Sequence, residues 1–164
     1  MNFKYTELHL NREKAGLRGT IGIIMFKPDC PKSEITNFYL FCKKQAVRII
    51  KRKDVIFDRN MLFSLYFRVF NLLKNDFLFG IKWKAEIIKY LEDSYTVCFL
   101  VECKGMNVVT ILNKYKYFLR EKYGKITNPK SLINNKDFVD KVIRNMVHTV
   151  DEKEIQNVLW LVFS

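Results

Sequence analysis

The stretch YTVCFLVECKGMNVVTILNKYKYFLREKYG, residues 95–124, contains the strongest secondary-structure signals in the chain. Its first nine residues are apolar and rich in β-branched and aromatic side chains, which predicts a buried strand that ends before Gly105. From Val108 to Leu119, apolar side chains recur at helical spacing along one stripe. Gly124 stands where the residue just beyond a helix C-terminus belongs. The stretch therefore predicts a buried strand followed by an amphipathic helix.

Upstream of this stretch, the pattern predicts two further strands with a helix between them. The apolar run at residues 19–26 reads as a strand that stops before Pro28, because proline cannot donate to a β-ladder. Ser33 is the expected N-cap of a helix that continues to Ala46. Residues 47–57 predict the next strand, interrupted by the basic triplet at 51–53, with its apolar side chains on one parity: Val47, Ile49, Val55 and Phe57.

Two helices are expected between the second and third strands. Asp58 or Asn60 is the predicted cap of a helix that reaches Leu73, and Gly80 is expected to separate it from a helix at residues 82–91. Beyond the amphipathic helix we expect a polar loop, a helical turn, a short strand and a final helix capped by Asp151. These segments are residues 127–136, 137–143, 145–149 and 151–163.

The order strand, helix, strand, two helices, strand, helix, strand, helix predicts an α+β fold. The specific expectation is a ferredoxin-like sandwich, in which helices cover a four-stranded antiparallel sheet and the helical pair is an insertion. A length of 164 residues suits one domain. We expect this domain at residues 18–164, after a polar N-terminal extension at residues 1–17.

Composition narrows the class of protein further. With 49% hydrophobic residues, the chain is not wholly disordered. It has no apolar run long enough to span a membrane and no secretory signal pattern, so we expect a cytoplasmic protein without membrane partners. The cysteines are expected to be reduced and mostly buried, and they are Cys30, Cys42, Cys98 and Cys103. The net charge of +12 favours anionic partners, among which nucleotides and nucleic acids both remain open.

The chain lacks the glycine-rich motifs that cradle phosphates through backbone N–H groups, so any bound phosphate must be held by side chains. His148 is the candidate for chemistry because of its position: it follows Arg144 and Asn145 at the end of a short apolar segment. An imidazole titrates near neutral pH and can attack phosphorus as a nucleophile. A lone histidine beside basic residues is nevertheless more often a surface or packing residue.

Several segments together resemble the nucleoside diphosphate kinase family. IIMFKPD at residues 23–29 is similar to the family strand that ends in K-P-D. RNMVHTVD at residues 144–151 is similar to its R-N-x-x-H-G-S-D segment, which bears the catalytic histidine. Between them, KYLEDS at residues 89–94, Arg120 and the T-N-P tripeptide at residues 127–129 match further landmarks in the same order. The resemblance extends from Gly19 to about Phe163.

This resemblance implies a ping-pong phosphotransferase in which His148 takes the γ-phosphate of a nucleoside triphosphate and passes it to a nucleoside diphosphate. Lys27 would contact the transferring phosphate. Arg120 and Thr127 would hold the other phosphates, bridged by Mg²⁺ that has no protein ligand of its own. Asn145 would bind the ribose hydroxyl, and Arg144 is placed beside it in the nucleotide site.

The resemblance also implies a base-binding clamp. Trp83 would stack on the base, Ile87 would complete an apolar clamp one helical turn further on, and Val142 would contact the opposite base face. Stacking accepts any base, which suits broad nucleotide use. Trp83 shares the helical face of Ile87, so an ordinary role of Trp83 in the core is the alternative.

The sequence departs from the family pattern at several positions. Asn135 stands where the family has a phosphate-binding arginine, and Thr149 and Val150 replace the Gly-Ser pair after the histidine. Glu154 is the nearest candidate for the glutamate that orients the imidazole. The alternative is therefore a weak or inactive kinase-like domain that binds nucleotide or nucleic acid. A shortened loop makes a homodimer a safer expectation than the hexamer of the family.

Overall fold

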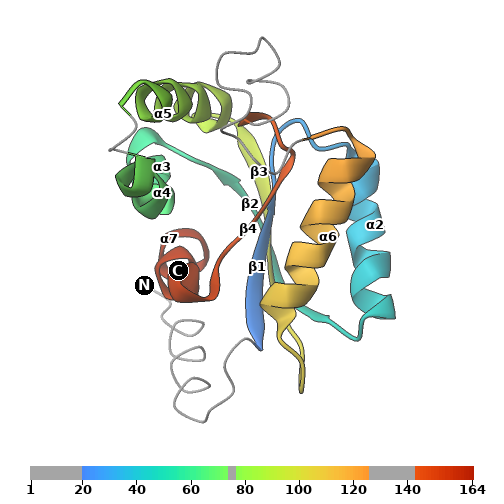
Figure 1. The fold of residues 1–164 in the computed structure, drawn as a ribbon. Coiled ribbons are helices and arrows are strands. Elements are labelled where there is room, and N and C mark those ends of the chain that lie inside the picture. Colours follow the sequence, from blue (N-terminus) through green and yellow to red (C-terminus); the bar gives the residue numbers. More distant parts are fainter. Residues whose placement is uncertain (1–19, 74–76, 126–142) are drawn as a thin grey trace.

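The computed structural model describes residues 20–73, 77–125 and 143–164 (Figure 1). These residues contain one antiparallel sheet in the order β2-β3-β1-β4. The strands are β1 at Ile21–Phe26, β2 at Arg48–Ile56, β3 at Tyr95–Glu102 and β4 at Val147–Thr149. This topology confirms the predicted ferredoxin-like α+β class. The expected N-terminal extension at residues 1–17 lies outside the described residues.

Helices cover both faces of the sheet, as Figure 1 shows. One face carries α2 at Lys32–Lys44 and α6 at Val108–Lys122. The other face carries the inserted helices, which are α3 at Arg59–Leu65, α4 at Phe67–Leu73 and α5 at Phe77–Leu91. It also carries α7 at Ile155–Phe163, which follows a 3-10 turn at Glu152–Glu154. No helix of the described residues is long and apolar enough to cross a membrane.

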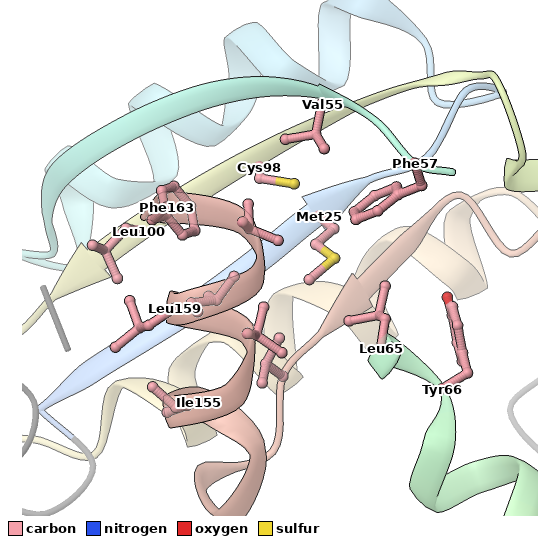
Figure 2. Packing of buried hydrophobic residues seen from close by; sticks show 14 of the residues in the cluster. Met25, Val55, Phe57, Leu65, Tyr66, Cys98, Leu100, Ile155, Leu159 and Phe163 are labelled. Carbon is pink, nitrogen blue, oxygen red and sulfur yellow. The ribbon is translucent and has the colours of Figure 1, made fainter. Parts of the chain in front are cut away.

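The central strands β1 and β3 are buried on both faces and divide the core into two clusters. Successive side chains of a strand point to opposite faces. Met25 and Cys98 therefore belong to the cluster under α7, whereas Phe26 and Phe99 belong to the cluster under α2 and α6. Figure 2 shows the first cluster, in which side chains of α7 pack against those of the sheet. All four cysteines are buried and free, as expected.

The predicted parity of β2 is wrong. Val47 packs in the cluster under α2, but Val55 and Phe57 pack in the cluster under α7. The register explains the change, because Ile49 pairs with Val101 while Lys51 pairs with the adjacent Leu100. One extra residue in β2 forms a β-bulge, which reverses the faces of all residues that follow it.

Some helix boundaries also differ from the prediction. Helix α2 begins at Lys32, so Ser33 is not its N-cap. The predicted helix up to Leu73 is divided at Tyr66 into α3 and α4, and Gly80 lies inside α5 instead of separating two helices. Asp58 does cap α3, accepting a hydrogen bond from the Met61 N–H at 2.8 Å. Asp151 precedes the 3-10 turn without a capping hydrogen bond from its side chain, and α7 starts at Ile155.

Candidate functional site

The ends of β1 and β4 bring two sequence-predicted site residues together. Met25 pairs with His148 across the two antiparallel strands. Just beyond β1, the Lys27 N–H donates to the Met146 carbonyl at 2.8 Å. Lys27 follows Met25 by two residues and therefore emerges on the same side of the sheet as His148.

The Lys27 ammonium is held in a buried position, with only 4% of the residue exposed. It donates to Asn145 Oδ1 at 2.7 Å and lies 3.5 Å from the Ile143 carbonyl oxygen. Burial and the nearby Arg120 charge lower the Lys27 pKa from 10.5 to about 7, against an opposing effect of Asp29. An anion bound here would favour the protonated form, so ligand and proton should bind together.

His148 is partly buried, and its ring centroid lies 5.7 Å from that of Tyr66. Burial lowers the pKa of His148 well below 6.5, and the charges of Lys27, Lys116 and Arg120 act in the same direction. The imidazole is therefore neutral at pH 7. A neutral imidazole has a nitrogen lone pair, as a nucleophile requires.

Helix α6 contacts β4, the strand that bears His148, from the face of the sheet opposite to Met25 and His148. Strand β4 is an edge strand, so side chains of α6 can reach its backbone at the sheet edge. Arg120 Nη2 donates to the Val147 carbonyl at 2.9 Å, which ties the arginine to the residue before His148. Its buried Nε has no hydrogen-bond partner among the described residues. Thr149 Oγ1 donates to Asn113 Oδ1 at 2.5 Å, which ties α6 to the residue after His148.

Tyr90 lies beside the same end of β1. Its hydroxyl donates to the Asp29 carboxylate, whose pKa is raised by burial. The Lys27 ammonium lies 5.8 Å from the centroid of the Tyr90 ring, and the guanidinium carbon of Arg144 lies 5.9 Å from it. The Tyr90 ring thus contacts two cationic side chains, and Arg144, a predicted nucleotide-binding residue, lies near Lys27.

Other predicted site residues are placed differently. Ile87 is 1% exposed within the core, so in this structure it does not offer a clamp surface to a base. Trp83 packs partly buried against the same cluster. Among the described residues, no hydrogen bond joins Glu154 to His148. Burial and Asp151 raise the pKa of Glu154, while Arg68 lowers it. Three positions singled out in the sequence lie outside the described residues: Thr127, Val142 and Asn135.

Two residues that sequence reasoning missed, Tyr66 and Lys116, belong to this cluster. Tyr66 is buried beside His148, and its pKa is raised by burial. Lys116 acts electrostatically on the imidazole from α6. Nothing in their local sequence distinguishes them from ordinary helix residues, because only the packing of α3 and α6 brings them to β4.

The cluster is positively charged and suits an anion. The described residues contain no group of three or more His, Cys, Asp or Glu side chains that could hold a metal ion. Around His148, the charges come instead from Lys27, Lys116 and Arg120. Phosphate groups are ligands of this chemistry.

Solved structures of nucleoside diphosphate kinases share this fold. A transition-state mimic of the Borrelia burgdorferi enzyme, with bound vanadate and ADP, is 16% identical, with a TM-score of 0.59 over 88% of this chain and 86% of that chain. The apo enzyme from Encephalitozoon cuniculi is 19% identical, with a TM-score of 0.55 over 86% of this chain and 88% of that chain. The kinase from Pyrobaculum aerophilum is 17% identical, with a TM-score of 0.53 over 86% of this chain and 94% of that chain.

No protein-family model matches the chain, and neither does any curated protein. At this level of identity, the structural likeness establishes the fold. The chain thus has the nucleoside diphosphate kinase fold, in a divergent form.

Proposed function

We propose that the protein transfers the γ-phosphate of a nucleoside triphosphate to a nucleoside diphosphate through a phosphohistidine at His148. The observation that supports this most directly is a neutral imidazole surrounded by cationic side chains at the end of β1. The vanadate and ADP in the structurally similar Borrelia burgdorferi kinase support the same choice of ligand.

In the first half-reaction, the imidazole lone pair forms a bond to the γ-phosphorus. The bond from that phosphorus to the β,γ-bridging oxygen breaks, and the oxygen keeps the electron pair as the nucleoside diphosphate leaves. In the second half-reaction, a terminal phosphate oxygen of another nucleoside diphosphate forms a bond to the phosphorus of the phosphohistidine. The P–N bond breaks, its electron pair returns to the ring nitrogen, and the imidazole is neutral again. Such transfers depend mainly on alignment and on neutralising phosphate charge.

Three of the described residues are suited to these two requirements. Lys27 lies on the same side of the sheet as His148. A nearby phosphate oxygen would favour the protonated form of Lys27. Arg120 is held by the Val147 carbonyl and keeps a buried Nε donor for the phosphate chain. Asn145 positions the Lys27 ammonium at 2.7 Å, in addition to its predicted contact with the ribose.

We propose that Mg²⁺ is bound by the phosphates of the nucleotide and has no ligand from the protein. A cluster of lysine and arginine side chains cannot ligate a cation, but it fits the phosphate oxygens to which the ion is bound. When bound, Mg²⁺ neutralises part of the phosphate charge that develops during transfer. We further propose that the domain at residues 18–164 acts in the cytoplasm as a homo-oligomer, with a dimer favoured over a hexamer.

Labelled ATP tests the assignment. Incubation should give a protein phosphate that is labile in acid, stable in alkali and transferable to GDP. His148→Ala should remove the label. The chain has two histidines, so His9→Ala is the matched control and should label like the wild type. Equal labelling of wild type and His148→Ala would refute the role of His148.

A second candidate function is nucleotide or nucleic-acid binding without turnover. It is favoured by the environment of the two residues after His148. Thr149 directs its hydroxyl to Asn113, and Val150 is buried in the core. Neither therefore replaces the serine that follows the family histidine. This alternative predicts salt-sensitive binding of ATP or an oligonucleotide, with no phosphohistidine.

A further inference from the structure

Helix α6 presents a polar stripe to the histidine strand. Asn113, Lys116 and Arg120 occur at spacings of three and four residues, which places them on one helical face. Asn113 is bonded to Thr149 and Arg120 is bonded to Val147, so the two ends of the stripe flank His148. Lys116 lies between these two anchors.

Lys116 is fixed in this position by a neutral partner. Its ammonium donates to Asn113 Oδ1 at 2.8 Å, the same oxygen that accepts from Thr149. The ammonium also lies 4.7 Å from the ring centroid of Tyr117, the next residue on the helix. A lysine ammonium has three donors, so these contacts leave capacity for an anion.

The surroundings of Lys116 are unfavourable for a cation. Burial and the Arg120 charge lower its pKa from 10.5 to about 8, and the Asp151 carboxylate opposes them. Lys27 is a third cation that acts on the same imidazole. Repulsion between clustered like charges is relieved by an anion that binds among them, which is why such clusters often mark binding sites.

We propose that the Lys116 ammonium binds phosphate oxygens of the nucleoside triphosphate aligned with His148. This inference rests on the proposed function and adds a ligand to it. Lys116 supplies a positive charge from α6, without the two-pronged geometry of a guanidinium.

Three variants test the role of Lys116. Lys116→Met keeps the aliphatic stem and removes the charge, Lys116→Arg keeps the charge, and Lys114→Met alters an exposed lysine on the same helix. A charged hydrogen bond contributes about 1.5–3 kcal/mol, so Lys116→Met should weaken ATP binding about 10- to 100-fold. Adenosine, which lacks phosphates, should bind the wild type and Lys116→Met equally. Lys116→Arg should retain most of the ATP affinity, and Lys114→Met all of it.

The outcomes separate this inference from the proposed function. If the wild type neither binds ATP nor forms phosphohistidine, the proposed function fails. If the wild type does both and Lys116→Met does both equally well, the role of Lys116 is refuted and the proposed function stands. A loss of adenosine binding in Lys116→Met would also overturn the inference, because it would show a general structural effect.

A measurement on the wild type covers the case in which Lys116→Met does not fold. An amine-reactive reagent is applied with and without a non-hydrolysable ATP analogue and Mg²⁺, and modification of each lysine is followed by mass spectrometry. The analogue should protect Lys116 and leave Lys114 unchanged. A saturating concentration of the analogue that leaves the modification rate of Lys116 unchanged would refute the contact.

Discussion

Replacing Lys27 with methionine should stabilise the folded protein while weakening nucleotide binding. The wild-type chain holds an ammonium in a buried position, where its pKa falls to about 7 because of burial and the Arg120 charge. Methionine has a similar length and no charge, so it removes the unfavourable burial. It also removes the hydrogen bond to Asn145 Oδ1. The proposed phosphate contact is lost in the same variant.

The size of the effect follows from proton linkage. The pKa of Lys27 is lower in the folded than in the unfolded chain, so the unfolded chain binds more protons and folding stability rises with pH through this window. Lowering the Lys27 pKa from 10.5 to about 7 reduces the free energy of unfolding by about 4 kcal/mol at pH 7 and by about 2 kcal/mol at pH 9. Losing the hydrogen bond costs about 1–2 kcal/mol. Lys27→Met should therefore gain about 2 kcal/mol at pH 7 and little at pH 9.

Urea unfolding at pH 7, 8 and 9 measures this difference directly. Burial raises the pKa values of three thiols, those of Cys30, Cys42 and Cys98, to about 12. Above about pH 9 the unfolded chain loses these protons more readily than the folded chain, so folding stability falls with pH. The titration therefore stops at pH 9. Lys104→Met, at an exposed position, is the control and should show no pH-dependent difference from the wild type. A constant difference between Lys27→Met and the wild type from pH 7 to pH 9 would refute the buried-cation argument.

Three further substitutions, with Trp160→Ala as a control, test the packing and hydrogen bonds of the fold that carries the site. Gly22→Ala should destabilise the protein by about 1–3 kcal/mol, because its Cβ would lie 2.7 Å from a Leu112 methyl carbon, as thermal unfolding can show. Phe163→Ala should cost about 3–5 kcal/mol by leaving a cavity under α7, whereas Trp160→Ala, at a side chain 47% exposed, should cost far less in the same urea titration. Glu34→Gln should cost about 1–3 kcal/mol at pH 7. Burial alone would raise the pKa of Glu34, but hydrogen bonds, led by that from Lys122, lower it below its ordinary value. The stability that the ionised Glu34 contributes is therefore lost as the pH falls through its folded-state pKa, and the difference between Glu34→Gln and the wild type should disappear there.

Much of the fold could be predicted because its signals are local. The apolar runs before Lys27 and after Ser94 predict buried strands, and the stripe from Val108 to Leu119 predicts an amphipathic helix. These elements are all present. The bulge in β2 could not be predicted, since it depends on how Ile49 and Lys51 pair with β3. A strand's own sequence does not record the register of its partner.

The candidate site divides in the same way. Lys27, Asn145 and His148 were found from the sequence because each lies in a short recognisable segment. The structure places Lys27 and Asn145 2.7 Å apart and brings the Lys27 charge to bear on His148. Thr127, Val142 and Asn135 keep the status of predictions, as do the contacts assigned to Arg144 and Trp83. Ile87 shows the limit of spacing arguments, because one helical face can serve either a ligand or the core.

The sequence by itself determined the order of the strands, the presence of helices between them, the imidazole near the carboxyl end and the lysine at the end of the first strand. Only the tertiary structure decided that Tyr66 and Lys116 stand beside that imidazole, and that the Lys27 ammonium is buried. The physical reason is that periodicity and turn chemistry act between near neighbours along the chain. A pKa depends instead on every charge and apolar surface nearby in space, wherever in the chain it originates.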